Sequence, residues 1–167
     1  MADVEKLLDR AKRYLEKNKT QDAIDAYLAV LEASPAHPEA VQSLGDLYIH
    51  QGDGARAAVY YGMLFDRLTD PREEPKAAAL YSRFLRGSEQ TPERQFRYAT
   101  ILHHQNKTSE ALENYTVAGE HFMARGREDD ALRCLEQAAE LDPDNGARQI
   151  SLAQLAEKRG RASLAAR

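Results

Sequence analysis

The sequence has 167 residues, of which 30% are charged, and its net charge is −4. It contains 27 Ala and 19 Leu but only 5 Val and 4 Ile. Ala and Leu favour helices, whereas β-branched residues favour strands, so the composition predicts an all-α protein and excludes a sandwich or a barrel. The 43% apolar share is enough to form a core, which excludes wholesale disorder.

Cysteine content and charge narrow the class further. The single cysteine, Cys134, excludes an internal disulfide and a four-cysteine metal site. No apolar run approaches the roughly 20 residues that cross a bilayer, so no membrane insertion is expected. The N-terminus begins with charged residues rather than a signal peptide, which favours a cytoplasmic protein. The acidic balance argues against a nucleic-acid partner.

Apolar periodicity and turn residues predict the elements in chain order. The expected helices cover residues 3–17, 21–33, 38–51, 55–68, 75–87, 92–105, 108–124, 128–141 and 146–159, with a stub after Arg161. Asn or Gly supplies the left-handed position at helix ends near residues 18, 52, 106 and 126. Thr20 and Thr108 are expected to cap the helices that follow them. Pro38, Pro71 and Pro92 stand where helices would begin.

An internal repeat of 34 residues organises these helices. Ala11 and Tyr14 recur as Gly45 and Tyr48, and Ala23 and Tyr27 recur as Ala57 and Tyr61. A small residue on one helix lets its neighbour approach closely, and the bulky residue one turn on fills the adjacent gap. Because neither helix of such a pair can bury its apolar stripe alone, the pairs are expected to stack into a solenoid.

At these positions the sequence resembles the tetratricopeptide repeat family, whose pattern is a Leu-Gly…Tyr helix followed by Ala…Phe and Pro. Residues 44–48, Leu-Gly-Asp-Leu-Tyr, followed by Ala57 and Tyr61, carry the resemblance, as does Leu-Asp-Pro-Asp-Asn at 141–145. The resemblance implies a right-handed α-α superhelix of antiparallel helix pairs, a single solenoid over residues 1–167. Its expected units are 4–37, 38–71, an irregular 72–111, 112–145 and a partial 146–167.

The third unit breaks the period. Continued from Gly45 the period reaches Ala79, which fits, but the aromatic Tyr81 comes one residue too early. A second register, Tyr98-Ala99 to Tyr115, also reads as a repeat, so helix 108–124 is expected to serve two pairs. The extra residues form a tolerated loop or a contact loop near residues 86–90.

Candidate chemical sites are scarce. His103 and His104 point about 100° apart on a helix and cannot chelate one ion from one face, and His121 does not complete a site. Residues 52–54, Gly-Asp-Gly, have neither a preceding strand nor a following Lys-Ser/Thr, so they do not predict a phosphate-binding loop. The sequence therefore predicts no cofactor, no metal and no enzymatic activity.

The resemblance implies instead that the first helix of each pair lines a concave groove that holds a protein or peptide partner. The positions expected to face it are Leu8, Lys12, Leu15, Gln42, Asp46, Ile49, His50, Thr116, Glu120, Met123, Ile150, Gln154 and Lys158. We therefore expect a non-catalytic protein-binding scaffold. The basic stretch after residue 147 is either a solvated helix or a docking feature.

Two further expectations concern partners. Family members that clamp the carboxylates of chaperone C-terminal tails use Lys and Asn in the first repeat, Asn in the second, and Lys with Arg in the third. The matching places here hold Leu8, Lys12 and Ser43, then residues around Glu73 and Ala77, so we expect no chaperone-tail binding. The incomplete fifth unit leaves open self-association through that end, or an N-terminal docking domain of a longer protein.

Overall fold

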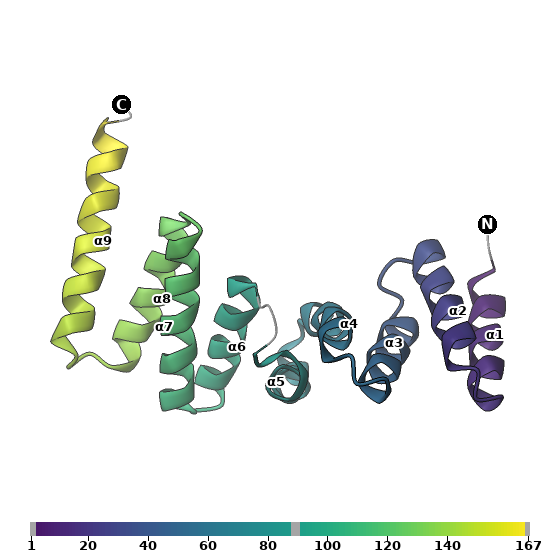
Figure 1. The fold of residues 1–167 in the computed structure, drawn as a ribbon. Coiled ribbons are helices and arrows are strands. Elements are labelled where there is room, and N and C mark those ends of the chain that lie inside the picture. Colours follow the sequence, from purple (N-terminus) through teal and green to yellow (C-terminus); the bar gives the residue numbers. More distant parts are fainter. Residues whose placement is uncertain (1–2, 88–90, 166–167) are drawn as a thin grey trace. The chain divides into compact units, whose positions relative to one another are not determined.

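A computed structural model describes residues 3–87 and 91–165, and side chains there except those of Arg148, Leu152 and residues 158–165. The chain forms two compact units, Met1–Ser88 and Glu89–Arg167. Every regular element in the described residues is helical, and consecutive helices run antiparallel within each unit (Figure 1). The predicted all-α class of tandem helix pairs is confirmed, while one solenoid over residues 1–167 stays a prediction.

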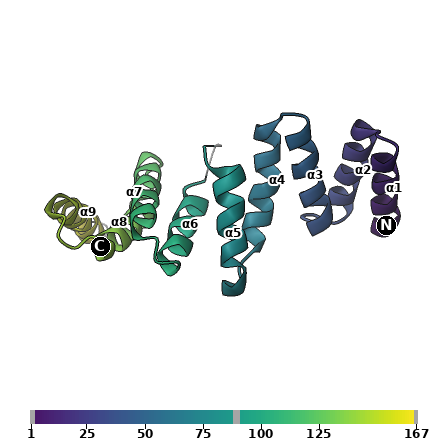
Figure 2. The same cartoon turned by 90° about the horizontal axis from the view of Figure 1, so that it is seen from below.

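The first unit contains five α-helices, one 3₁₀ turn and one π-helical turn among its described residues. The elements are α1 (Val4–Glu16), α2 (Thr20–Ala33), α3 (Pro38–His50), α4 (Gly54–Arg67), the 3₁₀ turn η1 (Pro71–Glu73), α5 (Glu74–Leu80) and the π-helical turn η2 (Tyr81–Leu85). Helices α1 and α2 pack as one pair and α3 and α4 as the next, and α5 with η2 lies alongside α4 (Figure 2). The sequence placed α1 to α4 within one residue of their observed ends.

The second unit contains four helices among its described residues. They are α6 (Pro92–His104), α7 (Thr108–Ala124), α8 (Glu128–Leu141) and α9 (Gly146–Ala165). The prediction for the last segment is wrong, because α9 continues through Gly160 and Arg161 as one helix of 20 residues. The isolated glycine therefore does not end the helix: it costs a helix interior only about 1 kcal/mol relative to alanine.

The turns between paired helices follow the predicted backbone chemistry. Asn18, Asn106 and Gly126 have φ values of 55°, 59° and 70°, in the left-handed region that closes a helix C-terminus. The predicted caps at Thr20 and Thr108 are wrong, since each threonine is itself the first helical residue and makes no capping hydrogen bond. Their hydroxyls stand one position too late to reach the free backbone N–H groups.

The small residues of the repeat sit at close helix contacts, as predicted. Ala11, Ala23 and Ala57 are at most 1% exposed. A Cβ atom added to Gly45 on α3 would lie only 2.9 Å from the ring of Tyr61 on α4. In the second unit, a Cβ added to Gly119 would lie 3.2 Å from the Cβ of Cys134. The small side chains therefore set the approach of neighbouring helices.

The third repeat differs from its prediction by one residue. Ala79, which the 34-residue period selects as the packed small residue, is exposed, whereas Ala78 is 8% and Tyr81 2% exposed. Ala78 and Tyr81 keep the small-then-aromatic spacing of three residues, displaced by one from the period. The predicted single helix 75–87 is instead α5 followed by η2, and the π turn accommodates an additional residue per turn. Residues 88–90 of the predicted contact loop lie outside the described residues.

Helix α7 belongs to two pairs, as the two competing registers predict. Toward α6, the Tyr115 ring lies 5.4 Å from that of Phe96, and the Tyr115 hydroxyl donates to the Thr100 hydroxyl oxygen at 3.1 Å. Toward α8, the Cβ of Cys134 lies 3.2 Å from the position that a Cβ on Gly119 would take. A helix in a stack touches both neighbours, so one sequence satisfies both patterns.

Replacing Gly45 by alanine tests the close contact. Overpacking a well-packed site costs about 1–3 kcal/mol, whereas Gly to Ala in a helix interior gains about 0.5–1 kcal/mol. The steric cost should exceed the gain in helix propensity, because Asp46 and Phe84 also hold the Tyr61 ring in place. We expect Gly45→Ala to lower the free energy of unfolding by about 1 kcal/mol, measured by denaturant unfolding followed by circular dichroism.

Gly54→Ala is the matched control, because a Cβ at Gly54 meets nothing within 4 Å. It should leave stability unchanged or raise it. Equal destabilisation by the two substitutions would contradict the packing role of Gly45.

Candidate binding cleft

A cleft of about 530 Å³ lies in the first unit between α3, α4 and the α5–η2 segment. Its three sides are formed by α3, by α4 and by the α5–η2 segment. Its lining residues are Gln42, Asp46, Ile49, His50, Tyr61, Leu64, Leu68, Lys76, Leu80, Arg83 and Phe84.

The inner wall of the cleft is apolar and built on Tyr61. Its ring stacks on Phe84 of η2, with centroids 3.9 Å apart and planes 14° from parallel. Its hydroxyl donates a 2.6 Å hydrogen bond to Oδ1 of Asp46. Burial, and secondly this bond to the carboxylate, raise the pKa of Tyr61 above its usual value, so the phenol stays protonated as a donor. Leu64, Leu68 and Leu80 complete the apolar surface.

The outer rim on the α5–η2 side is basic. Lys76 and Arg83 are exposed, and neither makes an ion pair with a described residue. The Arg83 guanidinium lies 4.9 Å from the ring centroid of Phe84, a contact that leaves its N–H donors available. π turns inside helices are frequently found at functional sites, and η2 supplies both Arg83 and Phe84 to this cleft.

Four predicted groove residues come together here: Gln42, Asp46, Ile49 and His50 all line the cleft from α3. All four are exposed, and Ile49 is 43% exposed despite being aliphatic. Sequence reasoning missed the lining residues of α4 and α5–η2, because it considered the first helices only and carried the wrong register into the third unit. The early Tyr81 was the available signal.

The predicted groove residues of α1 do not line this cleft. Leu8 is 8% exposed and belongs to the core, and Leu15 is partly buried. Lys12 is exposed and forms a 2.7 Å ion pair with Glu39 of α3. The hydrogen bond to Glu39 raises the pKa of Lys12. Lys12 therefore links α1 to α3.

The predicted residues of the second unit are dispersed. The Thr116 hydroxyl donates to the Leu112 carbonyl at 2.9 Å, and Glu120 and Gln154 are exposed. Met123 and Ile150 are 42% and 59% exposed. The Lys158 side chain lies outside the described residues.

A smaller cleft of about 110 Å³ in the second unit contains none of these residues. It is lined by Glu93, Phe96, Phe122, Arg127, Asp130 and Arg133. Arg127 pairs with Glu93 and with Asp130, Arg133 also pairs with Asp130, and the Arg127 guanidinium lies over Phe122. The arginines, Arg133 first, lower the pKa of Asp130. These charges satisfy one another.

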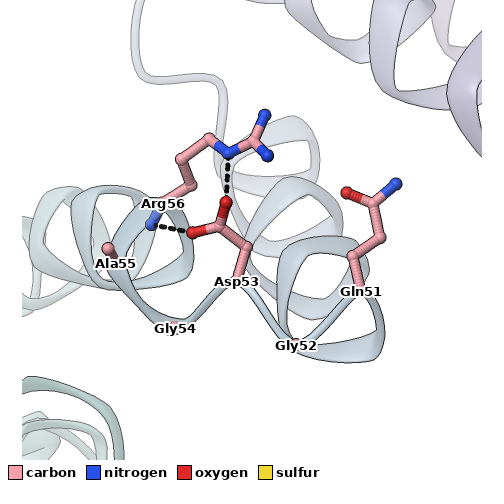
Figure 3. Close-up of a pocket in the computed structure, with 6 residues that line it drawn as sticks. All are labelled: Gln51, Gly52, Asp53, Gly54, Ala55 and Arg56. Carbon is pink, nitrogen blue, oxygen red and sulfur yellow. Dashed lines mark hydrogen bonds and ion pairs between the residues drawn. The ribbon is translucent and has the colours of Figure 1, made fainter.

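Residues 51–56 line a shallow pocket at the start of α4. The carboxylate of Asp53 lies there against Arg56 (Figure 3). Asp53 accepts from the Arg56 backbone N–H at 2.9 Å and from Arg56 Nε at 2.5 Å. This is an N-terminal cap of α4. It explains the Gly-Asp-Gly sequence without a phosphate.

The remaining candidates are the two adjacent histidines and the single cysteine. The rings of His103 and His104 lie 6.4 Å apart and are inclined by 38°, and the described side chains contain no group of three metal-ligating residues. Cys134 is buried, which raises its thiol pKa to about 12, so it carries little thiolate at neutral pH. Among the described helices, none combines the length and apolar character of a membrane span.

Comparison with known proteins identifies a repeat family. A family profile described as tetratricopeptide repeat matches residues 8–68 and 116–167, about two thirds of the chain. No curated protein matches the sequence significantly.

Three solved structures illustrate the structural similarity. MamA is 18% identical, with 94% of this chain and 82% of that chain covered and a TM-score of 0.42. The first TPR of Spaghetti (RPAP3), bound to an HSP90 peptide, is 17% identical, with 94% and 93% covered and a TM-score of 0.35. The Sgt2 TPR domain from Aspergillus fumigatus is 15% identical, with 100% and 85% covered and a TM-score of 0.36. The family assignment rests on the profile match.

The Asp53 cap gives a pH-dependent prediction. Its pKa is lowered from 3.8, first by the Arg56 backbone N–H and then by the Arg56 side chain. The stabilisation by the carboxylate is therefore complete above the unfolded pKa and is lost as pH falls through the lower folded pKa. We expect Asp53→Asn to have a lower Tm than wild type at pH 7 and the same Tm at the acid end of a pH 7 to 2 series.

Asp9→Asn, on the exposed face of α1, removes the same charge at a position that caps no helix. It should lower Tm less than Asp53→Asn at pH 7. A Tm difference for Asp53→Asn that persists unchanged into acid would contradict the role of the carboxylate.

Proposed function

The chain belongs to the tetratricopeptide repeat family, and we propose that it is a non-catalytic scaffold that binds a protein or peptide segment in the cleft between α3, α4 and α5–η2. One observation carries this proposal. An exposed isoleucine, Ile49, stands on the edge of a cleft whose inner surface is Leu64, Leu68, Leu80 and Phe84.

The physical argument is one of exposed apolar area. Covering an aliphatic side chain that is 43% exposed, together with the apolar cleft, releases about 25 cal/mol per Å² of buried apolar surface. Binding hot spots are apolar anchors in pockets surrounded by a polar rim. Gln42, His50, Lys76 and Arg83 provide such a rim, so the cleft suits one or two aliphatic side chains of a partner. In the second unit, exposed Met123 and Ile150 stay candidates for a separate contact with a partner.

The proposed partner is not a chaperone C-terminal tail. With the third repeat displaced by one residue, its clamp positions become Arg72 and Lys76 rather than Glu73 and Ala77. The Arg72 guanidinium is held by Asp70, with Nη2 and Oδ2 2.6 Å apart. In the first repeat, Leu8, which is buried, and Lys12 stand where the clamp has lysine and asparagine. In the second repeat, Ser43 stands where the clamp has asparagine. The asparagine donors of the clamp are therefore missing.

The cleft is tested by peptide selection. A display library of 16-residue random peptides is selected on the whole protein, and the selected peptides are measured by fluorescence anisotropy. We expect Ile49→Glu to weaken their binding at least about tenfold, because a charge replaces an apolar contact at the cleft edge. Val59→Glu is the matched control: Val59 is 57% exposed on α4 and does not line the cleft.

Val59→Glu should leave binding within about twofold of wild type, since a substitution outside the contact is near neutral. Equal loss in both variants, or none in Ile49→Glu, would refute the cleft as the binding site. Circular dichroism of the two variants establishes that both are folded.

A separate measurement addresses the chaperone tail. A peptide that ends in Glu-Glu-Val-Asp with a free carboxylate is titrated against the protein by calorimetry. We expect no binding at micromolar concentrations. Micromolar affinity would contradict the conclusion that the clamp is incomplete.

A further inference from the structure

We propose that the segment bound in this cleft is an acidic amphipathic helix that carries a carboxylate on each side of an aliphatic anchor. This inference rests on the proposed function and specifies the chemistry of the partner. It follows from the charge and spacing of the α5–η2 wall.

The two cations on this wall have no internal counter-ion among the described residues, although the protein is acidic overall. Elsewhere in the unit, Lys12, Arg56 and Arg72 each pair with a carboxylate, whereas Arg13 and Lys17 pair with no described carboxylate and do not line the cleft. Lys76 and Arg83 do not, yet both line the cleft beside an apolar surface. Electrostatic complementarity at an interface places opposite charge against such a pair, so the partner should present carboxylates to this wall.

The spacing of the cations sets the spacing of those carboxylates. Lys76 and Arg83 are seven residues apart on the continuous helical segment α5–η2, with Leu80 between them. At 1.5 Å rise per residue this is roughly 10 Å along the axis. Two acidic residues at i and i+7 of a helix match this separation, so each can face one of the two cations. Residues i+3 and i+4 then lie on the same face between them and reach Leu80 and Ile49.

The opposite wall fixes the orientation of the helix across the cleft. On α3, Oδ1 of Asp46 already accepts the Tyr61 hydroxyl, and its negative charge disfavours an acidic side chain nearby. Gln42 and His50 are the other polar groups on that wall. The acidic edge of the partner helix should therefore lie along α5–η2, and an uncharged or basic edge along α3.

The peptide selection described above tests this inference when its products are sequenced and varied. We expect peptides that depend on Ile49 to carry Asp or Glu at i and i+7 around Leu, Ile or Met at i+3 or i+4. Their C-terminal amides should bind as tightly as the free acids. The double variant Lys76→Glu/Arg83→Glu should weaken binding at least about tenfold, because two opposite charges become two like charges.

Arg13→Glu is the matched control: Arg13 is exposed on α1 and does not line the cleft. It should change binding less than twofold. A second selection on the double variant should enrich Lys or Arg at the same two positions, which a merely destabilised protein would not do.

The outcomes separate the two proposals. If Ile49-dependent peptides are neutral or basic, or need a free C-terminal carboxylate, the acidic helix is wrong and the cleft remains a binding site. If no selected peptide depends on Ile49, the proposed function itself fails, and the acidic helix with it.

Discussion

The contact between a small residue on one helix and a large ring on the next is the interaction on which this fold depends. Gly45 allows the Tyr61 ring to lie where any Cβ would be 2.9 Å from it. The same ring then reaches Asp46 with its hydroxyl and stacks on Phe84. One packing contact therefore joins α3, α4 and η2, and it also forms the inner wall of the cleft.

The parts of the fold that depend on local backbone chemistry could be predicted from the sequence. Asn18 and Asn106 adopt left-handed conformations at helix ends, and Pro38 and Pro92 are first helical residues. Each signal acts within one turn of helix, so no tertiary information is needed to interpret it. The wrong caps at Thr20 and Thr108 show the limit, because a difference of one residue decides whether a hydroxyl can cap.

The features that the sequence did not predict are those that neighbouring elements determine. A 34-residue period counts residues, whereas η2 holds an additional residue within a helix without breaking it. The shift itself arises before η2, in α5, where Ala77 and Ala78 rather than Ala79 are the buried small residues. The same displacement concealed Lys76 and Arg83 as cleft residues. On α3, where the period holds, the four residues that the sequence places on the groove side all line one cleft, and their role in binding stays a prediction; they are Gln42, Asp46, Ile49 and His50.

The break in the period has a consequence for specificity. In a regular repeat array, residues at equivalent positions make the same helix contacts in every repeat. This repeated geometry alone does not distinguish one ligand from another. At α5–η2 the helix changes its hydrogen-bond spacing, and Arg83 and Phe84 enter the cleft beside Tyr61. Helix α4 provides Leu64 and Leu68, and the irregular element adds Leu80, Phe84 and two cations that pair with no described carboxylate. In the proposed complex the apolar surface would favour many partners, and the two cations few. In the proposed complex, selectivity would therefore come from the segment in which this chain departs from its own repeat.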